Sequence, residues 1–261
     1  MSSTSSVKTI DRMVMVLGCF SAERPAWSLA ELSVHLGLPK STLYRFLVSL
    51  EYHNILHRNP EDKRWRLGYR LFVWGNLAGE STNLRQLARP AMRDLVEATN
   101  ETAILTVYQN QEVVCIDKVE TSHPVRMTLD VGTRRHPHAG ASSKVLMAYL
   151  PQAEISAIIK NKGLPKLCTN TITDPEELAC ELARIRENEY AESQEETDWG
   201  AWGVATPIRD SKGDVVAAVG VAGPRSRFTE GLAGKYVALC CQAAQQISSL
   251  ISLEVAESSR G

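Results

Sequence analysis

The sequence predicts an α+β protein made of an N-terminal winged helix-turn-helix domain, a linker helix and a C-terminal domain of helices around a sheet. Two observations lead to this prediction. Residues 28–68 follow the order of short helix, glycine turn, proline, second helix and β-hairpin. Beyond residue 101 the helical spacing of apolar residues gives way to alternating strands. The expected boundaries are 1–68 for the first domain, 69–83 for the linker helix and 84–261 for the second domain.

Charge divides the chain in the same way, although its net charge is only −1. Residues 1–68 hold nine Lys and Arg against six Asp and Glu, whereas residues 69–261 hold twenty against twenty-four. DNA is a polyanion, so a small basic domain suits it and an acidic remainder need not touch it. Because the excess is small, we expect salt-sensitive DNA binding that depends on a dimer.

Residues 7–20 form the first expected helix, because apolar residues recur there at helical spacing. This helix would pack under the next two helices and could also meet a partner subunit. Its expected inward residues are Ile10, Met13, Val14, Leu17 and Phe20.

Local signals then predict two helices and the turn between them. Ser28, with Glu31 three residues later, suits a capping box at the start of the first helix. Gly37 suits its end, and Pro39, which has a fixed φ and no N–H, suits the first position of the next helix. The buried faces are expected at Leu29, Leu32 and Leu36 and then at Leu43, Phe46, Leu47 and Leu50.

The second helix of this pair is expected to read DNA. Its N-terminal end carries donors, hydroxyls and an aromatic ring, which a recognition helix presents to base edges in the major groove. The hairpin that follows, with its turn at 59–63, suits a wing for phosphate or minor-groove contact. The alternative is an ordinary helical hairpin and a surface hairpin in another kind of domain. The expected contact residues are Lys40, Ser41, Thr42, Tyr44, Arg45, Arg58, Lys63 and Arg64.

The rest of the chain predicts a sensor-like α+β domain. After the linker helix, residues 84–100 form a helix that Pro90 should kink or whose true start it should mark. Its inward residues are expected to be Leu84, Leu87, Ala91, Leu95 and Val96. Strands are expected at 102–108, 112–118, 125–131, 202–209 and 215–221, with a tight turn at 110–111 between the first two. Helices are expected at 141–150, 151–161, 174–189 and 230–256.

Composition excludes several other classes of protein. The chain is 44% hydrophobic and 23% charged, an ordinary globular balance. No apolar run reaches the ~18 residues that a membrane span needs, and residues 1–6 lack the pattern of a signal sequence. The six cysteines have no CxxC pair and no metal-site spacing. We expect a reduced, cytoplasmic protein without a membrane anchor or a cofactor.

Three stretches resemble the IclR family of bacterial transcription regulators. They are LAELSVHLGLPKSTLYRFL at 29–47, VGTRRHPHAGASSKVLMAYL at 131–150, and TITDPEELACELARIRENEYAESQEET with GVATPIRDSKGDVVAAVGVAGPRSRFT at 171–229. The resemblance implies a winged-helix domain, a linker helix and a GAF-like effector-binding domain. It also implies a homodimer or tetramer on a palindromic operator near catabolic or metabolic genes. Repressor is the commoner role in the family, and activator stays open.

The candidate effector site has a physical basis beside this resemblance. The loop at 139–142 opens a helix, whose free N–H groups and dipole suit a carboxylate. Small residues that only allow helix and sheet to pack closely are the alternative. The positions that the resemblance assigns to the effector are Met127, Ala141, Ser142, Ser193, Ala201, Gly203, Gly220 and Ala222.

This chain departs from family members that bind small keto acids. They tend to have Cys in the stretch matching Gly203, serines matching Gly220 and Ala222, and an acidic residue matching Ser193. The smaller or less polar residues here suggest a roomier, more apolar pocket for a larger acid or lactone, such as an aromatic one. Trp199 and Trp202 could line this pocket or could be ordinary core or interface aromatics.

Other chemistry has weaker support in the sequence. His136 and His138 lie two apart in a loop, but zinc would need further ligands that the sequence does not nominate, so no metal is expected. His138 is expected to hold the loop by a hydrogen bond, and Arg134 and Arg135 could attract an anion or be solvated. No HExxH, P-loop or GxSxG occurs, and Ala141 stands where a Ser-x-x-Lys nucleophile would be. An enzyme on a GAF-like domain and a protein–protein adaptor remain the alternatives.

Overall fold

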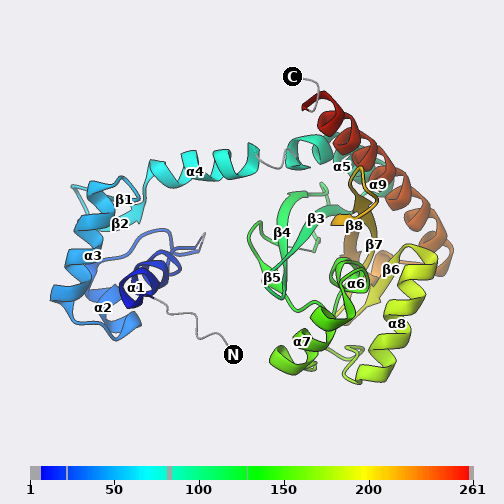
Figure 1. The fold of residues 1–261 in the computed structure, drawn as a ribbon, viewed down its shortest axis with the longest axis horizontal. Coiled ribbons are helices and arrows are strands. Elements are labelled where there is room, and N and C mark those ends of the chain that lie inside the picture. Colours follow the sequence, from blue (N-terminus) through cyan, green and yellow to red (C-terminus); the bar gives the residue numbers. More distant parts are fainter. Residues whose placement is uncertain (1–6, 22, 81–83, 128, 259–261) are drawn as a thin grey trace. The chain divides into compact units, whose positions relative to one another are not determined.

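A computed structural model describes residues 7–21, 23–80, 84–127 and 129–258 (Figure 1). Its contacts divide the chain into two compact units, one up to Thr82 and the other from Asn83 onward. The predicted α+β fold class is confirmed, with a small two-stranded sheet in the first unit and a six-stranded sheet in the second. None of the helices in the described ranges is long and apolar enough to cross a membrane.

The first unit is a winged helix-turn-helix around one small core. Trp27 and Trp65 exchange two backbone hydrogen bonds of 3.0 and 2.7 Å, so the segment before the second helix pairs with the wing. The core consists of Val16, Trp27, Leu32, Leu43, Leu47, Leu50, Leu56 and Trp65. The elements are α1 (Lys8–Leu17), α2 (Leu29–Leu36), α3 (Lys40–Tyr52), β1 (Leu56–Arg58), β2 (Trp65–Leu67) and α4 (Tyr69–Glu80).

The inward face predicted for helix α1 is wrong in part. Ile10 and Val14, expected inside, are 58% and 61% exposed, whereas Val16 is fully buried. Ile10, Met13, Val14 and Leu17 share one apolar stripe of the helix, but Val16, which lies beside this stripe, is the residue that enters the core of the first unit. The helix also ends at Leu17 rather than continuing to Phe20. An apolar stripe is therefore left on the surface of α1.

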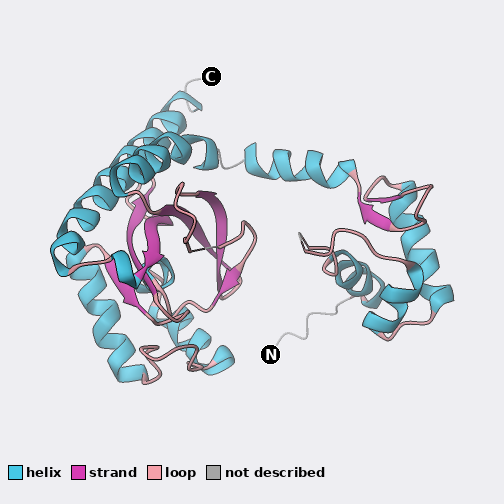
Figure 2. Cartoon of the chain, turned by 180° about the vertical axis from the view of Figure 1, so that it is seen from behind, coloured by secondary structure: helices cyan, strands magenta, loops and turns pink. Residues whose placement is uncertain are grey.

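The second unit is built on one antiparallel sheet with the strand order β5-β4-β3-β8-β7-β6. In Figure 2 these strands form a curved sheet with helices on both sides. The strands are β3 (Thr102–Gln109), β4 (Glu112–Val119), β5 (Arg134–Arg135), β6 (Ala191–Gln194), β7 (Ala201–Arg209) and β8 (Val215–Pro224). The helices are α5 (Leu84–Thr99), α6 (Ala141–Ala148), α7 (Gln152–Lys162), α8 (Pro175–Asn188), α9 (Glu230–Ser258) and the 3-10 turn η1 (Arg225–Arg227).

Two separate cores cover the two faces of this sheet. On one face, α5 and α9 pack against residues of β3, β7 and β8 that include Leu105, Val204 and Val219. On the other face, α6, α7 and α8 pack against residues that include Ala205 and Ala218. Successive side chains of a strand point to opposite faces, so β3, β7 and β8 each contribute to both cores. The face under α6 carries the smaller side chains.

Three predicted details of this unit need correction. The described residues of 125–131 form no strand, because the Val125 carbonyl accepts a hydrogen bond from the Arg227 side chain (2.8 Å) instead of from a neighbouring strand. A two-residue strand, β5, pairs with β4 in its place. Strand β6 was not predicted, because its polar sequence AESQ lacks apolar alternation. Helix α5 begins at Leu84 and continues through Pro90, and it buries Ala88 and Met92 where Leu87 and Val96 are only half-buried.

Candidate functional site

The N-terminal end of α3 is an exposed polar surface over a buried apolar one. Lys40, Ser41, Tyr44 and Arg45 are exposed and Thr42 is half-buried. On the opposite side Leu43, Leu47 and Leu50 are buried in the core of the first unit. None of these five polar residues has a side-chain hydrogen bond or ion pair within the described residues, so their polar groups are free for another molecule.

The predicted signals around α2 hold the turn in place. The Ser28 hydroxyl accepts a hydrogen bond from the Glu31 N–H (3.2 Å), and the Glu31 carboxylate accepts one from the Ser28 N–H (2.8 Å), which completes the capping box. Gly37 ends the helix with φ +64°, a conformation that favours glycine. Pro39 lies at the N-cap of α3, one position earlier than predicted. The local sequence therefore sets where α2 begins and ends and where α3 begins.

The wing contains two kinds of cation. Arg58 and Lys63 are exposed and lie within ion-pair distance of no described carboxylate. Arg64 donates to the Glu31 carboxylate (3.2 Å) and the Ala26 carbonyl (3.4 Å), so a phosphate would have to compete for it. Glu31 is held ionised, because its hydrogen bonds with Ser28 lower its pKa to about 2. Arg58 and Lys63, which have no carboxylate to compete with, are thus the better placed for a backbone phosphate, although Arg58 also donates to the Lys63 carbonyl (3.3 Å).

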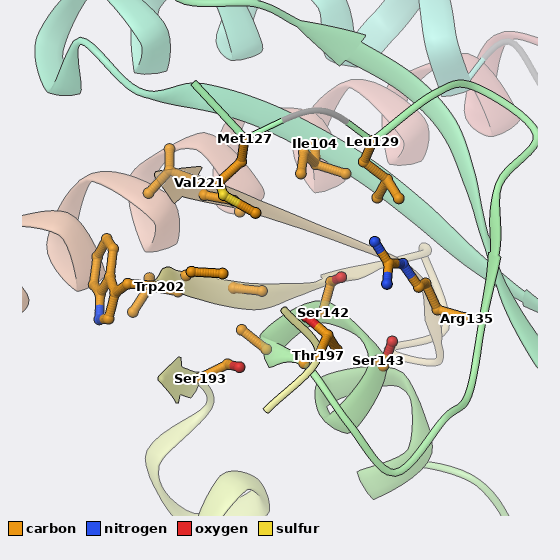
Figure 3. Close-up of a pocket in the computed structure, with 18 of the residues that line it drawn as sticks. Ile104, Met127, Leu129, Arg135, Ser142, Ser143, Ser193, Thr197, Trp202 and Val221 are labelled. Carbon is orange, nitrogen blue, oxygen red and sulfur yellow. The ribbon is translucent and has the colours of Figure 1, made fainter. Parts of the chain in front are cut away.

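A cavity of about 100 Å³ lies between the sheet of the second unit and the start of α6 (Figure 3). Its lining comes from β3, β5, β7, β8, the end of β6, the loop after β6 and the loop that carries Met127. All eight residues expected at an effector site line this one cavity: Met127, Ala141, Ser142, Ser193, Ala201, Gly203, Gly220 and Ala222.

Unpartnered polar groups face one side of the cavity. The N–H groups of Ala141, Ser142 and Ser143 precede the first hydrogen bond of α6, which runs from the Lys144 N–H to the Gly140 carbonyl (2.9 Å). Within the described residues, the hydroxyls of Ser142, Ser143 and Ser193 have no hydrogen-bond partner either. Ser143 and Ser193 are buried, so their hydroxyls have little access to bulk water. A carboxylate bound here would find both N–H groups and hydroxyls.

A buried charge cluster fixes the start of α6. The Lys144 side chain is 2% exposed, and its amine donates to the Glu181 carboxylate (2.8 Å), the Glu192 carbonyl (2.8 Å) and the Glu196 carboxylate (2.6 Å). The second oxygen of Glu196 accepts from the Gly140 N–H (2.9 Å). Burial raises the pKa of Glu196, while the Lys144 cation opposes this shift. Lys144 and Glu196 therefore join α6 to the loop after β6.

The other side of the cavity is apolar. Ile104, Met127 and Leu129 lie opposite Ser142, Ser143 and Thr197 in Figure 3.

Trp202 contributes main chain only, because its ring packs on the other face of the sheet and stacks on Phe228 with ring centroids 3.7 Å apart. Trp202 is therefore a core aromatic. Trp199 is 77% exposed and is not among the cavity residues.

Gly203 and Gly220 contribute less space to the cavity than predicted. A Cβ built on Gly220 would come within 2.1 Å of the Val204 carbonyl, so this glycine allows β7 and β8 to approach each other. A Cβ on Gly203 would lie 3.1 Å from the Val221 carbonyl, which is tight but much less severe. The space in the cavity comes instead from alanines such as Ala201 and Ala222.

Comparison with known families identifies both units. The family described as "Bacterial transcriptional regulator IclR C-terminal" matches residues 77–249, and the family "IclR helix-turn-helix domain" matches residues 9–60. The chain belongs to the IclR family of bacterial transcriptional regulators. It is thus a DNA-binding transcriptional regulator, and its relatives do not support the alternative of an enzyme.

Relatives match this IclR-family chain over nearly its whole length. The transcriptional regulator KdgR of Escherichia coli is 30% identical over 244 residues, which cover 94% of this chain and 92% of the relative. The transcriptional repressor IclR of Escherichia coli is 28% identical over 247 residues, 94% and 90% of the two chains. A crystal structure of an IclR homologue from Microbacterium hydrocarbonoxydans, complexed with 4-hydroxybenzoate, matches with a TM-score of 0.83 and 28% identity over 92% of this chain and 97% of that one.

Several residues at the cavity of this IclR-family chain were not among the predicted site residues. Ile104, Leu129 and Thr197 reach the cavity through strand register and loop folding, which no local signal predicts. Arg135 and Asp198 line it as an ion pair (3.2 Å). Of these five, Arg135 alone carried a sequence signal, as a cation that could attract an anion.

One of the two histidines near the cavity, His138, holds a loop by a hydrogen bond. His138 is fully buried, and its Nε2 lies 3.1 Å from the Pro165 carbonyl, which confirms the predicted hydrogen bond. Burial lowers the pKa of His138, so its ring is neutral at pH 7. The His136 and His138 rings are 5.6 Å apart. In the described part of the chain, no group of three or more His, Cys, Asp or Glu side chains could hold a metal ion.

Proposed function

We propose that this IclR-family regulator is a repressor whose C-terminal cavity binds an aromatic or similarly sized carboxylic acid. The observation that carries the proposal is the two-sided lining of the cavity. Free N–H groups and hydroxyls at the start of α6 lie on one side, and Ile104, Met127 and Leu129 lie on the other. A ligand with a carboxylate and an apolar body matches both sides.

The size of the cavity supports one aromatic ring. A cavity of about 150 Å³ holds benzene in a well-studied case, and the cavity here is of similar order at about 100 Å³. The bound 4-hydroxybenzoate of the Microbacterium homologue supports the same class of ligand. The small side chains of Ala201 and Ala222 leave room over the sheet that larger residues would fill.

On DNA, we expect two copies to bind a palindromic operator. Two recognition helices related by a two-fold axis enter successive major grooves about 34 Å apart. The proposed contacts are Lys40, Ser41, Thr42, Tyr44 and Arg45 on α3, with Arg58 and Lys63 and, after competition with Glu31, Arg64 on the wing. Exposed apolar residues on α1 and α4, such as Val14 and Phe72, support pairing of two copies.

The ligand would change DNA affinity by favouring one of two arrangements of the dimer. It can shift this equilibrium only by the difference between its affinities for the two states. Several relatives are named repressors, which supports repression relieved by the acid. A regulator of this kind works where the chromosome is, so we expect it in the cytoplasm.

A thermal-shift screen of the purified chain tests the ligand class. A compound that binds the folded state raises the melting temperature by mass action. We expect aromatic acids such as benzoate and 4-hydroxybenzoate to raise it, and the matching amides to do so much less. Stabilisation only by two- and three-carbon keto acids would refute the proposed pocket chemistry, and stabilisation by none of the acids would refute the ligand class.

A mobility shift with DNA from upstream of the chain's own gene tests operator binding separately. We expect a discrete complex that survives competitor DNA and dissociates as salt rises. Binding no tighter than to unrelated DNA would refute this site as the operator.

A further inference from the structure

We infer that Asp198 is a built-in competitor for the ligand, because it holds Arg135, which would otherwise pair with the ligand's carboxylate. This inference rests on the proposed function, since it concerns the same cavity. It makes Arg135 the residue that selects for an acid and Asp198 the residue that limits how tightly the acid binds.

Arg135 and Asp198 are the two charged side chains among the residues that line the cavity. One guanidinium nitrogen of Arg135 lies 3.2 Å from one carboxylate oxygen of Asp198. The side chains are 31% and 42% exposed, so the pair lies where water can reach it. Figure 3 shows the guanidinium of Arg135 pointing toward the space between Leu129 and Ser142.

Strand register explains why this arginine and not its neighbour faces the cavity. Arg134 and Arg135 form β5 and pair with Val114 and Val113 of β4. Adjacent residues of a strand point to opposite faces, so one arginine turns away when the other turns in. Arg134 is 54% exposed and pairs with Glu112 (2.8 Å), away from the cavity residues. The two arginines thus form a matched pair with different surroundings.

The loop that carries Asp198 is fixed at its start and open at its tip. The Glu195 carboxylate pairs with Arg225 (2.6 Å) and accepts from the Gly200 N–H (3.0 Å). Glu196 is held by Lys144 and the Gly140 N–H. By contrast, Arg135 is the only described side chain that binds the Asp198 carboxylate. Asp198 can therefore release Arg135 without breaking the anchors of the loop.

The geometry favours exchange of one carboxylate for another. The contact between Arg135 and Asp198 uses a single nitrogen and a single oxygen and is partly exposed, and such pairs are weak. A ligand carboxylate can meet a guanidinium with two parallel hydrogen bonds, which is the stronger arrangement. The ligand would also bring its apolar body against Ile104 and Leu129, which Asp198 cannot do.

The test compares binding of 4-hydroxybenzoate by calorimetry in the wild-type protein and five variants. Arg135→Met should weaken binding at least ten-fold and remove the preference for 4-hydroxybenzoate over 4-hydroxybenzamide. Asp198→Asn and Asp198→Ala should instead tighten binding by about two- to five-fold, the range for losing a partly exposed competing pair. In the double variant Arg135→Met/Asp198→Asn, the gain from the second change should vanish. Arg134→Met is the matched control and should bind like the wild type.

The outcomes separate this inference from the proposed function. A wild type that binds no acid refutes the proposed function, and the inference falls with it. A wild type that binds 4-hydroxybenzoate, with Asp198 variants that bind equally or more weakly, refutes the inference alone, because a purely structural pair would give those results. Melting temperatures without ligand identify any variant that fails to fold. If one of the two Asp198 variants fails to fold, the other still measures how loss of the carboxylate changes binding.

Discussion

The buried lysine beside the cavity gives the sharpest prediction for stability. Lys144→Met removes a 2% exposed cation that has three oxygen partners between 2.6 and 2.8 Å. Glu181 would keep Arg184, at 2.9 Å, but Glu196 would remain as a buried carboxylate without a cation. Leaving one member of a buried ion pair alone costs roughly 3–5 kcal/mol. We expect a loss of this size in the free energy of unfolding at pH 8.

The pH dependence of this loss identifies its cause. Glu196 already has a raised pKa because it is buried, and losing Lys144 would raise it further. A carboxyl whose pKa is higher in the folded than in the unfolded state binds more protons when folded. Its cost is therefore full above the folded pKa and shrinks as the pH falls from that value toward 4.5, the ordinary value for Glu. The variant should approach the wild type near pH 5.

Urea unfolding followed by circular dichroism, at pH 8 and at pH 5, measures this difference. Lys118→Met is the matched control, because Lys118 also pairs with two carboxylates, Glu120 and Asp130, but is 20% exposed. It should lose only about 0–1 kcal/mol. Adding Glu196→Gln to Lys144→Met should restore part of the stability, since the amide keeps an acceptor for Gly140 without the charge. An equal loss for both lysine variants, or a loss independent of pH, would show that the cluster is not a charge network.

The remaining predictions concern the DNA-reading helix, the capping box and the sheet. Arg45→Ala should weaken operator binding by more than about 1 kcal/mol in a mobility shift, and unchanged affinity would refute the proposed reading face. Glu31 has its pKa lowered to about 2, so its stabilising contribution is present above pH 4.5 and is lost as the pH falls toward 2. The melting temperature of Glu31→Gln should therefore be lower than that of the wild type at pH 7 and equal to it near pH 2. A difference in melting temperature that does not change with pH would contradict this. Gly220→Ala should cost about 1–3 kcal/mol, because its Cβ would clash with the Val204 carbonyl, while Gly203→Ala should cost clearly less. Equal costs in urea unfolding would mean that β8 shifts to accommodate either methyl group.

Local chemistry made the winged helix predictable from the sequence. Ser28 and Glu31 cap α2, Gly37 supplies the left-handed residue that ends it, and each acts through bonds within a few residues. The turn at Asn110 and Gln111 is equally local, and both residues have the positive φ that a tight hairpin turn requires. The cavity residues were predicted differently, by position within a family resemblance, and all eight line one cavity.

What could not be predicted depends on contacts between distant segments. The choice of Val16 over Val14 as the buried residue of α1 is made by α2 and the tryptophans, not by the helix itself. The loop through Met127 follows an irregular path because Arg227, a hundred residues later, binds the Val125 carbonyl. Nothing in the sequence around Lys144 signals a buried cation, since its partners come from α8 and from the loop after β6. Roles that arise from register or from remote partners need the fold.

One measurement tests the central claim that the acid controls DNA binding. Fluorescence anisotropy gives the Kd of the purified protein for its operator DNA, without ligand and with the acid found in the thermal-shift screen at saturation. The account predicts that the acid raises the Kd for the operator. By linkage, bound operator must raise the Kd for the acid by the same factor. An acid that fills the cavity and leaves the operator Kd unchanged would contradict the account, because a ligand with equal affinity for both states shifts nothing.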